Sequence, residues 1–355
     1  MPSFWITANS PGEISGWLKP VAKRLKQRRP DLTLQVILLP CTFATGHEAE
    51  VAKQVVDEVY TLANVPKTRP EGLLHLGGDL MYAAFLARQH GMPTWAYQWA
   101  QRQWDRFFTG YLVKTDQDRD RLLRQRIAPD KIYVVGDLVT DSVLDQIDAP
   151  PAPKQPPQTI LYLPGSRQRE AEQLLPFFLS VSKLLPGFRY ETMLSPFLQP
   201  LAPRLVPHPK LEGMPAETTP EAIVGDGVSI AIRPHGMATV AHADLVVSIP
   251  GTKTAEAAVL GRPTVTILPL NAPEEIPSVG LVGLLDYLPG VGRMVKGFFL
   301  PRMVARMGYV AQPNILAGHE VVPEVRGVLT AAMVGERVSA LLKEAETMSR
   351  MAIEL

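Results

Sequence analysis

The stretch LYLPGSRQRE (residues 161–170) joins an apolar run to a sharp turn and then to a charged, helix-like segment. The run 161–163 is typical of a buried strand, while Gly165 and Ser166 are typical of a turn and a helix N-cap. A helix that begins there directs its free N–H groups beyond the strand end. Arg167 adds a permanent cation. The stretch therefore predicts a seat for an anion, although a strand–helix turn without a ligand has a similar composition.

A second stretch, ADLVVSIPGTKTAEAAVLGRPTVTI (243–267), repeats this arrangement. Its glycine permits close approach of the backbone to a ligand, and hydroxyls and N–H groups follow at the helix start. The predicted binding residues share this turn and the first helical residues: Gly251, Thr252, Lys253, Thr254 and Glu256. The alternative is a plain helix N-terminus capped by Thr252, with Glu256 as its first-turn acid. Two such turns in one domain favour a bound diphosphate. Neither the P-loop nor the dinucleotide-binding glycine pattern occurs.

Composition limits the classes of function. The chain has 355 residues, 46% hydrophobic and 20% charged, which suits two globular domains. A net charge of +1 gives no signal for nucleic acid as a partner. Cys41 is the single cysteine, so no internal disulfide forms and a reducing, cytoplasmic setting is expected. We see neither a signal-peptide pattern nor an uninterrupted apolar run of membrane-spanning length.

Strand and helix patterns alternate along the chain, which is typical of parallel α/β sheets. In the first part they cover 4–27, 34–40, 72–79, 111–127 and 131–137. The segment 149–158 has five prolines in ten residues and predicts a stiff linker. The alternation then resumes. We therefore predict an α/β protein with two doubly wound, Rossmann-like domains, 1–148 and 159–355, joined by the linker 149–158. The cleft between two such domains is the default ligand site.

Several of these segments resemble the lipid-A-disaccharide synthase family. The similar segments are LPGSRQREAEQLLPFFL (163–179), ADLVVSIPGTKTAEAAVLGRPTV (243–265), GYVAQPNILAGHEVVPE (308–324), SPGEISG (10–16) and VVGDLVTDSV (134–143). That family comprises inverting GT-B glycosyltransferases, which join a UDP-linked acylated glucosamine to a lipid acceptor. The resemblance thus implies the GT-B fold, a UDP-sugar donor and a lipid acceptor. It also implies that the domain 1–148 lies on the acceptor side and that the domain 159–355 binds the nucleotide sugar.

The resemblance also implies roles for particular residues. Those expected to bind the donor are Gly165, Ser166, Arg167, Arg233, Gly251, Thr252, Lys253, Thr254, Glu256, Gln312 and Asn314. Arg167 would neutralise the diphosphate and Glu256 would hold the ribose, while Asn314 falls on the family's functional asparagine with Glu320 nearby. The residues expected on the acceptor side are Ser10, Glu13, Ser15 and Trp17.

The sequence departs from the family pattern at several positions. Trp17 replaces an aspartate, and Pro250 stands where a serine is usual. The stretch expected to carry the base is reduced to GGDLMYA (77–83), and the chain is shorter than typical members. These changes leave the acceptor and the base open.

Inverting transfer needs a base for the acceptor hydroxyl and positive groups for the departing diphosphate. Asp79 is the first candidate for the base and Glu13 the second, with Asn314 as a further catalytic candidate. An N-cap is the alternative role of Asp79. Since arginine, lysine and helix termini stabilise a diphosphate, we expect no metal and no other cofactor. TDQDRDRLL (115–123) suits a capped helix rather than a calcium loop.

The segment 276–308 combines apolar residues with four basic ones and three prolines. This composition fits an interfacial segment on an anionic membrane, and ordinary packed helices with basic edges are the alternative. The segment 95–108 carries three of the five tryptophans and would line the acceptor site, touch lipid or belong to the core. If the segment 276–308 is interfacial, the protein would be cytoplasmic and peripherally associated with the inner face of a membrane.

We therefore predict a glycosyltransferase that moves a sugar from a UDP-sugar to a lipid at the membrane surface. A nucleotide-sugar 2-epimerase and a catalytically silent nucleotide-sugar-binding or membrane-associated protein are the alternatives. The sequence leaves open the sugar, the lipid and assembly into a homo-oligomer.

Overall fold

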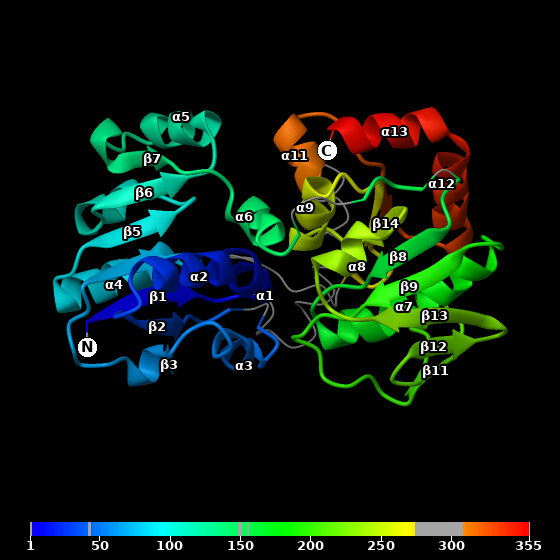
Figure 1. Ribbon diagram of the computed structural model, residues 1–355, viewed down its shortest axis with the longest axis horizontal. Helices are drawn as coiled ribbons and strands as arrows, with labels where there is room; N and C mark the ends of the chain where they lie inside the picture. The colour runs from blue at the N-terminus through cyan, green and yellow to red at the C-terminus, as the bar shows by residue number, and fades with distance from the viewer. Residues whose placement is uncertain (1, 42–43, 148–150, 155, 274–307, 355) are drawn as a thin grey trace. The chain divides into compact units, whose positions relative to one another are not determined.

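The structure is a computed structural model that describes residues 2–41, 44–147, 151–154, 156–273 and 308–354. The chain divides into two compact units, Met1–Asp145 and Gln146–Leu355 (Figure 1). Almost all of the segment 276–308, which the sequence analysis assigned to a membrane surface, lies outside the described residues. No helix in the described part of the chain is both long and apolar enough to span a membrane.

Unit 1 contains a seven-stranded sheet in which all neighbouring strands are parallel. In spatial order the strands are β3 (Glu58–Thr61), β2 (Thr33–Leu38), β1 (Ser3–Ala8), β4 (Gly72–His75), β5 (Thr94–Tyr97), β6 (Gly110–Val113) and β7 (Ile132–Val134). From β1 the chain continues through β2 to β3 at one edge of the sheet, and from β4 it continues through β5 and β6 to β7 at the other edge. The order therefore reverses between these two strands, where open α/β sheets place their ligands.

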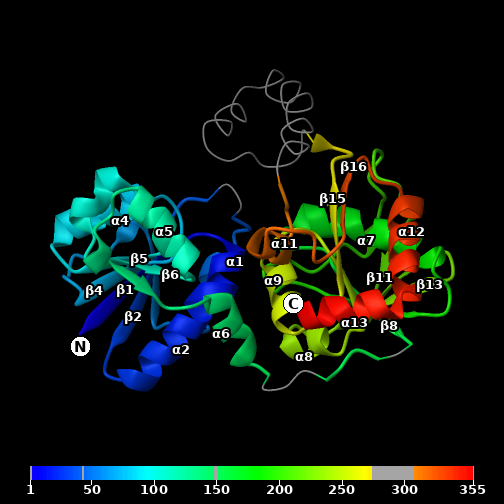
Figure 2. The same ribbon diagram turned by 90° about the horizontal axis from the view of Figure 1, so that it is seen from above.

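Helices cover both faces of this sheet. They are α1 (Pro11–Glu13), a π-helical turn η1 (Ile14–Leu18), α2 (Lys19–Arg28), α3 (Glu48–Ala52), η2 (Leu62–Asn64), α4 (Leu80–His90), η3 (Arg102–Phe107), α5 (Asp116–Arg124), η4 (Pro129–Lys131) and α6 (Leu138–Leu144). Figure 2 shows α4 and α5 on one face, and α2 and α6 on the other. The first face buries apolar residues of the strands, among them Trp5, Leu73 and Tyr111. Burial on both faces explains why these strands are continuous apolar runs.

Unit 2 contains a nine-stranded sheet. In spatial order its strands are β10 (Arg204–Leu205), β11 (Ala216–Thr218), β12 (Ala222–Gly225), β13 (Val228–Arg233), β9 (Arg189–Met193), β8 (Thr159–Leu163), β14 (Leu245–Ser248), β15 (Thr264–Pro269) and β16 (Glu324–Gly327). From β13 to β16 the pairs are parallel, whereas β10, β11 and β12 extend the sheet as an antiparallel edge that the sequence did not predict. The strand order reverses between β8 and β14.

The helices of unit 2 are α7 (Gln168–Lys183), α8 (Met237–Ala241), α9 (Thr252–Val259), α11 (Gln312–Ala317), α12 (Ala331–Lys343) and α13 (Ala345–Glu354). Helix α7 packs against α12, and its buried Phe178 stacks on Tyr162 of β8 with ring centroids 4.5 Å apart. This contact joins the first strand of the unit to its first helix, so that the turn between them is fixed at both ends.

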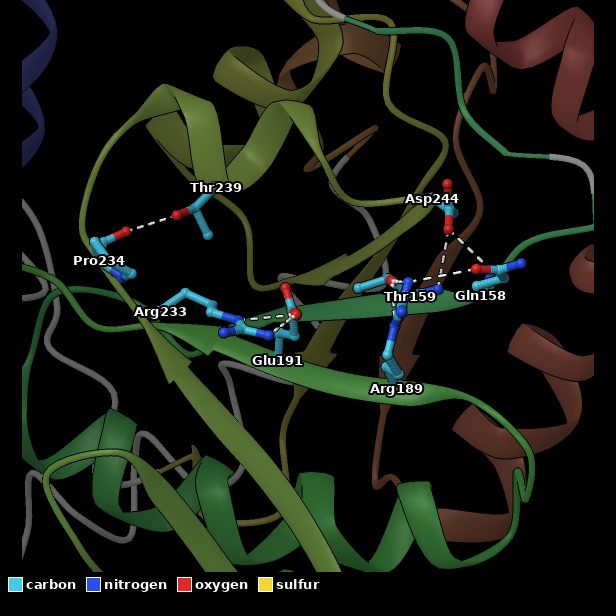
Figure 3. Close-up of polar contacts among 8 residues, drawn as sticks. All are labelled: Gln158, Thr159, Arg189, Glu191, Arg233, Pro234, Thr239 and Asp244. Atoms are coloured by element: carbon cyan, nitrogen blue, oxygen red, sulfur yellow. Dashed lines mark hydrogen bonds and ion pairs between the residues drawn. The ribbon is translucent and has the colours of Figure 1, made fainter.

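The proline-rich segment is tied to unit 2 by a buried carboxylate. Asp244 accepts hydrogen bonds from the backbone N–H groups of Lys154, Gln158 and Thr159 at 2.7, 2.9 and 3.0 Å, and Figure 3 shows its carboxylate directed at the last two residues. The described residues of 151–158 form no helix or strand. The composition of the segment excludes regular structure, and Asp244 supplies the anchor in its place.

Candidate functional site

The two glycine turns expected to bind an anion follow β8 and β14, which are neighbours in the sheet of unit 2. Gly165 has a φ of +97°, and a Cβ at this position would lie 2.6 Å from Cδ1 of Ile249, which follows β14. Only glycine combines this backbone conformation with so close a contact. The sequence pattern thus correctly placed both turns, and the structure brings them together at the reversal of the strand order.

Both helices that follow these turns begin without a side-chain cap. The N-cap of α7 is Arg167 rather than Ser166, and the N-cap of α9 is Gly251 rather than Thr252. Neither N-cap residue accepts a side-chain hydrogen bond from its helix. The alternative of a helix capped by Thr252 is therefore wrong. Uncapped N–H groups and the positive end of the helix dipole favour a bound anion at each start.

Each cation at these turns lies beside a carboxylate three residues later. Arg167 pairs with Glu170, and Nζ of Lys253 lies 2.6 Å from Oε2 of Glu256. Glu256 is only 3% exposed, so its carboxylate is largely shielded from water. A diphosphate would compete with these carboxylates for the two cations. Because the carboxylate of Glu256 is already paired with Lys253, it could accept a hydrogen bond from a ribose hydroxyl only in addition to this ion pair.

Helix α11 begins against the start of α9. Oγ1 of Thr254 donates a hydrogen bond to the carbonyl oxygen of Gly251 at 2.8 Å and accepts one from the backbone N–H of Gln312 at 3.3 Å. The buried hydroxyl of Thr254 thus forms its hydrogen bonds within the protein, where it joins the starts of α9 and α11. Thr254 would therefore position these helix starts rather than contact a ligand with its hydroxyl. The structure brings Gln312 to the start of α9, and its expected role in donor binding stays a prediction.

Asn314, expected to be functional, is fully buried and uses all its hydrogen-bonding capacity within the protein. Its Oδ1 accepts from the N–H groups of Val321 and Val322 at 2.7 and 2.8 Å. Its Nδ2 donates to the carbonyl oxygen of Val322 and to Oε1 of Glu324 at 2.8 and 2.9 Å. A buried amide with four partners holds the backbone rather than a ligand, so Asn314 is a positioning residue of α11.

Glu324, which the sequence analysis missed, is the acid that contacts Asn314. Its Oε1 also accepts from the N–H groups of Val310 and Ala311 at 2.9 and 2.8 Å, immediately before α11. Glu320, expected near Asn314, is half exposed and lies 3.5 Å from Arg337 of α12. Both glutamates belong to the same quoted motif, and nothing local distinguishes the buried one from the exposed one.

Arg233 lies at the end of β13 and pairs with Oε1 of Glu191 on β9 at 2.6 and 2.8 Å. Figure 3 shows the two side chains directed at each other. β13 is two strands away from β8, which corresponds to about 10 Å at the usual strand spacing. No contact links Arg233 to the two glycine turns in the described residues, so its expected donor role has no support from the geometry.

In unit 1 the reversal between β1 and β4 carries a capping box. Ser10 caps α1 and its side chain accepts from the N–H of Glu13 at 3.4 Å. Oε2 of Glu13 accepts from the N–H groups of Asn9 and Ser10 at 2.9 and 3.2 Å. Burial raises the pKa of Glu13 to about 7, against the lowering effect of those N–H groups. The carboxyl is thus poised to exchange a proton near neutral pH.

Gly77 provides the space for this carboxyl. A Cβ at Gly77 would lie 1.9 Å from Cδ and Oε2 of Glu13 and 2.2 Å from its Oε1. The backbone after β4 therefore passes directly against the carboxyl group after β1. The sequence analysis quoted the Gly-Gly-Asp stretch for its acid and missed this function of its first glycine.

Asp79 caps α4, with its Oδ1 accepting from the N–H of Met81 at 2.8 Å, which confirms the alternative role considered for it. Its side chain is exposed. Two of the residues expected on the acceptor side form contacts within unit 1. Ser15 donates to the carbonyl oxygen of Pro11 at 2.8 Å, and Trp17 packs edge-on against Tyr97 with ring centroids 5.3 Å apart. Both belong to the π-helical turn η1, a form often found at functional sites.

No group of three or more metal-ligating side chains is present in the described residues. The acidic stretch 115–123 forms α5, capped by Thr115, whose Oγ1 accepts from the N–H of Asp118. The expectation of a capped helix there is confirmed.

The comparisons with known proteins agree with this architecture. No family model matches the chain. Over 198 residues, 56% of this chain, it is 28% identical to lipid-A-disaccharide synthase of Syntrophus aciditrophicus (strain SB), and over 185 residues, 51% of the chain, 29% identical to that of Myxococcus xanthus (strain DK1622). These matches confirm the resemblance. They span 43% and 38% of the relatives' own length, so the chain aligns with less than half of each relative.

Solved structures define the class of fold. The UDP-GlcNAc 2-epimerase of Neisseria meningitidis, in a structure bound to UDP-GlcNAc, superposes with a TM-score of 0.54 at 14% identity over 99% of this chain and 94% of its own. MurG of Acinetobacter baumannii gives 0.51 at 14% over 100% and 94%, and the calicheamicin glycosyltransferase CalG4 gives 0.52 at 12% over 99% and 93%. The chain has the GT-B fold, as the resemblance implied.

Proposed function

We propose that this protein is a glycosyltransferase that moves a sugar from a UDP-sugar to a lipid acceptor at a membrane surface. The observation that carries the proposal is the pair of uncapped helix starts after β8 and β14, in a chain similar to lipid-A-disaccharide synthases. The donor would bind there, with its diphosphate on the N–H groups of α7 and α9. Arg167 and Lys253 would stabilise the charge of the departing UDP.

We assign the general base to Glu13 rather than to Asp79. A base works best with a pKa near the working pH, and burial raises that of Glu13 to about 7. Two backbone N–H groups and the close approach of Gly77 also fix its position. Asp79 is exposed and holds the start of α4. In the proposed reaction a single displacement inverts the sugar centre, and the two cations would take the place of a metal ion at the departing diphosphate.

The lipid acceptor and the peripheral location, on the cytoplasmic face of a membrane, rest on the similarity to the curated relatives and on the composition of 276–308. The rival function is 2-epimerisation of a nucleotide sugar, because epimerases of the same fold superpose along nearly the whole chain. A third candidate is a protein that binds a nucleotide sugar without turnover.

One incubation separates the three functions. The purified protein is mixed with radiolabelled UDP-GlcNAc and a bacterial lipid extract. The proposal predicts label in the organic phase and release of UDP. Label that stays in UDP-sugar with changed stereochemistry would establish the epimerase. Binding without either product would establish the silent protein, and both of these results would overturn the proposed activity.

Gly77→Ala tests the support of the base. Its methyl group would meet the Glu13 carboxyl at 1.9 Å, so we expect the carboxyl to move and kcat to fall about 10- to 100-fold. The KM for the UDP-sugar should stay unchanged because the donor residues lie in unit 2. Gly91→Ala is the control, because a Cβ at Gly91 would meet no atom within 4 Å. Gly91 has a φ of +62° and Gly77 has no positive φ, so the control carries the greater backbone strain. Equal kcat values for the two variants would contradict the assignment.

A further inference from the structure

Strand β7 leaves one edge of the sheet of unit 1 open and apolar. It is the last strand in the spatial order, and no described strand lies beyond it (Figure 1). Tyr133, Val134 and Val135 are 49%, 45% and 49% exposed. Each of the other sheet edges carries an exposed charged side chain: Glu58 on β3, Arg204 on β10 and Arg326 on β16. An uncharged apolar edge is a template for pairing with a further strand, so the β7 edge fits an interaction surface.

The backbone of Val134 is directed at this open edge. The N–H of Val135 donates to the carbonyl oxygen of Val113 on the neighbouring strand β6 at 2.8 Å. Successive residues of a strand direct their N–H and C=O groups to opposite sides. The N–H and C=O groups of Val134 therefore point away from β6, and they can form hydrogen bonds with an added strand.

The residues two positions before and after Val134 complement each other. The N–H of Ile132 donates to the carbonyl oxygen of Pro129, so its own carbonyl remains as an acceptor. The carbonyl oxygen of Gly136 accepts from the Tyr97 hydroxyl at 3.2 Å, so its N–H remains as a donor. An antiparallel copy of the same edge would thus match acceptor with donor at both ends.

We propose that the β7 edge, defined by residues 132–136, pairs with the same edge of a second copy of this chain across a two-fold axis at Val134. The two Val134 residues would exchange a pair of hydrogen bonds, and the carbonyl of Ile132 would accept from the N–H of Gly136 of the partner subunit. This register places Lys131 opposite Asp137 of the partner subunit.

Charge complementarity favours a second copy over an unrelated strand. Lys131 pairs with Asp105 at 3.1 Å at one end of the edge, and Asp137 pairs with Lys114 at 3.2 Å at the other. The four side chains keep part of their surface exposed, so antiparallel pairing would join two ion pairs into one network at each end. The pairing uses the side of the sheet rather than its carboxyl edge, where Glu13 lies, and does not rest on the proposed function.

The first test is sedimentation velocity of the full chain over a concentration series. We expect a reversible monomer–dimer equilibrium with a Kd of about 1–100 μM, since two short strands bury a small interface. Val134→Lys should weaken it at least about 10-fold, because two like charges would face each other at the axis. Val206→Lys is the matched control, since Val206 is 74% exposed beside the edge strand β10, and it should dimerise as the wild type does.

Cross-linking tests the register. Residues that exchange hydrogen bonds across antiparallel strands have Cα atoms about 5.5 Å apart, which is within reach of a disulfide. In a Cys41→Ser background, Val134→Cys should therefore form a disulfide-linked dimer under mild oxidation, and Val206→Cys should not. A wild-type chain that stays monomeric, equal weakening by the two lysine variants, or equal cross-linking of the two cysteine variants would overturn the proposal.

Titration of UDP into the same variants keeps this result separate from the proposed function. Unchanged UDP affinity of Val134→Lys together with a lost dimer supports the β7 edge, because the variant is then folded. If Val134→Lys fails to fold, the cross-linking of Val134→Cys, which introduces no charge, still decides the proposal.

Discussion

Glu13→Gln should lower kcat by about 100- to 10,000-fold, because glutamine keeps the shape and the acceptor oxygen but cannot take a proton. In the wild type, kcat/KM should rise with pH and level off above about 7, where Glu13 is ionised in the folded protein. The variant should lose this rise. Initial rates of UDP release between pH 5.5 and 9 measure both effects.

The stability of the same variant separates a catalytic role from a structural one. The pKa of Glu13 is raised from 4.5 to about 7 on folding, so the folded state holds the proton more tightly than the unfolded state. The contribution of the protonated Glu13 carboxyl to the free energy of unfolding is therefore fully present below pH 4.5, and it is lost as the pH rises through 7. Glu13→Gln should be about as stable as the wild type at pH 4.5 and should exceed it by about 3 kcal/mol at pH 8. A variant destabilised at pH 8 would mean that the carboxylate serves the capping box instead.

Asn314→Leu should lower the free energy of unfolding by about 3–5 kcal/mol. The leucine would leave the buried N–H groups of Val321 and Val322 without their acceptor, and it would remove one of the three donors to Oε1 of Glu324. Urea denaturation measures the change. Asn314 ties α11 to Val321, Val322 and Glu324, and α11 in turn contacts α9. UDP affinity should therefore also fall at temperatures where the variant remains folded.

Ile315→Ala is the matched control for Asn314→Leu. Ile315 is the next residue on α11 and is 50% exposed, so its truncation should change stability by less than about 1 kcal/mol and leave UDP affinity intact. An Asn314→Leu protein that unfolds at the wild-type urea concentration would contradict the positioning role.

Local sequence patterns predicted the parts of this fold that depend on local chemistry. The turns at Gly165 and Gly251 could be predicted because a buried strand, a glycine and the start of a helix follow one another directly in the sequence. The pattern misjudged each helix start by one residue, choosing Ser166 and Thr252 as caps. Serine and threonine are strong N-caps in general, but here the last non-helical residue before each helix is Arg167 or Gly251.

Local sequence patterns could not predict contacts between residues that lie far apart in the chain. Glu13 and Gly77 meet because β1 and β4 are neighbours, and the sequence gives no strand order. The preference for Asp79 as base came from its position after a strand, whereas the burial that changes the pKa of Glu13 appears only in three dimensions. Asn314 was found through its motif, but the motif does not say that its amide is buried among backbone groups. The antiparallel strands β10–β12 have only two to four residues each, too few for a recognisable alternation.

Calorimetric titration of UDP tests the central claim, that the turns after β8 and β14 form the donor site. The wild-type protein should bind UDP equally well with and without magnesium. Arg167→Ala should weaken binding about 10-fold or more, because a charged hydrogen bond to the diphosphate is lost. Arg204→Ala removes the same charge from the edge strand β10 and should leave the affinity unchanged. No heat of binding from folded wild-type protein, or equal weakening by both variants, would contradict the account.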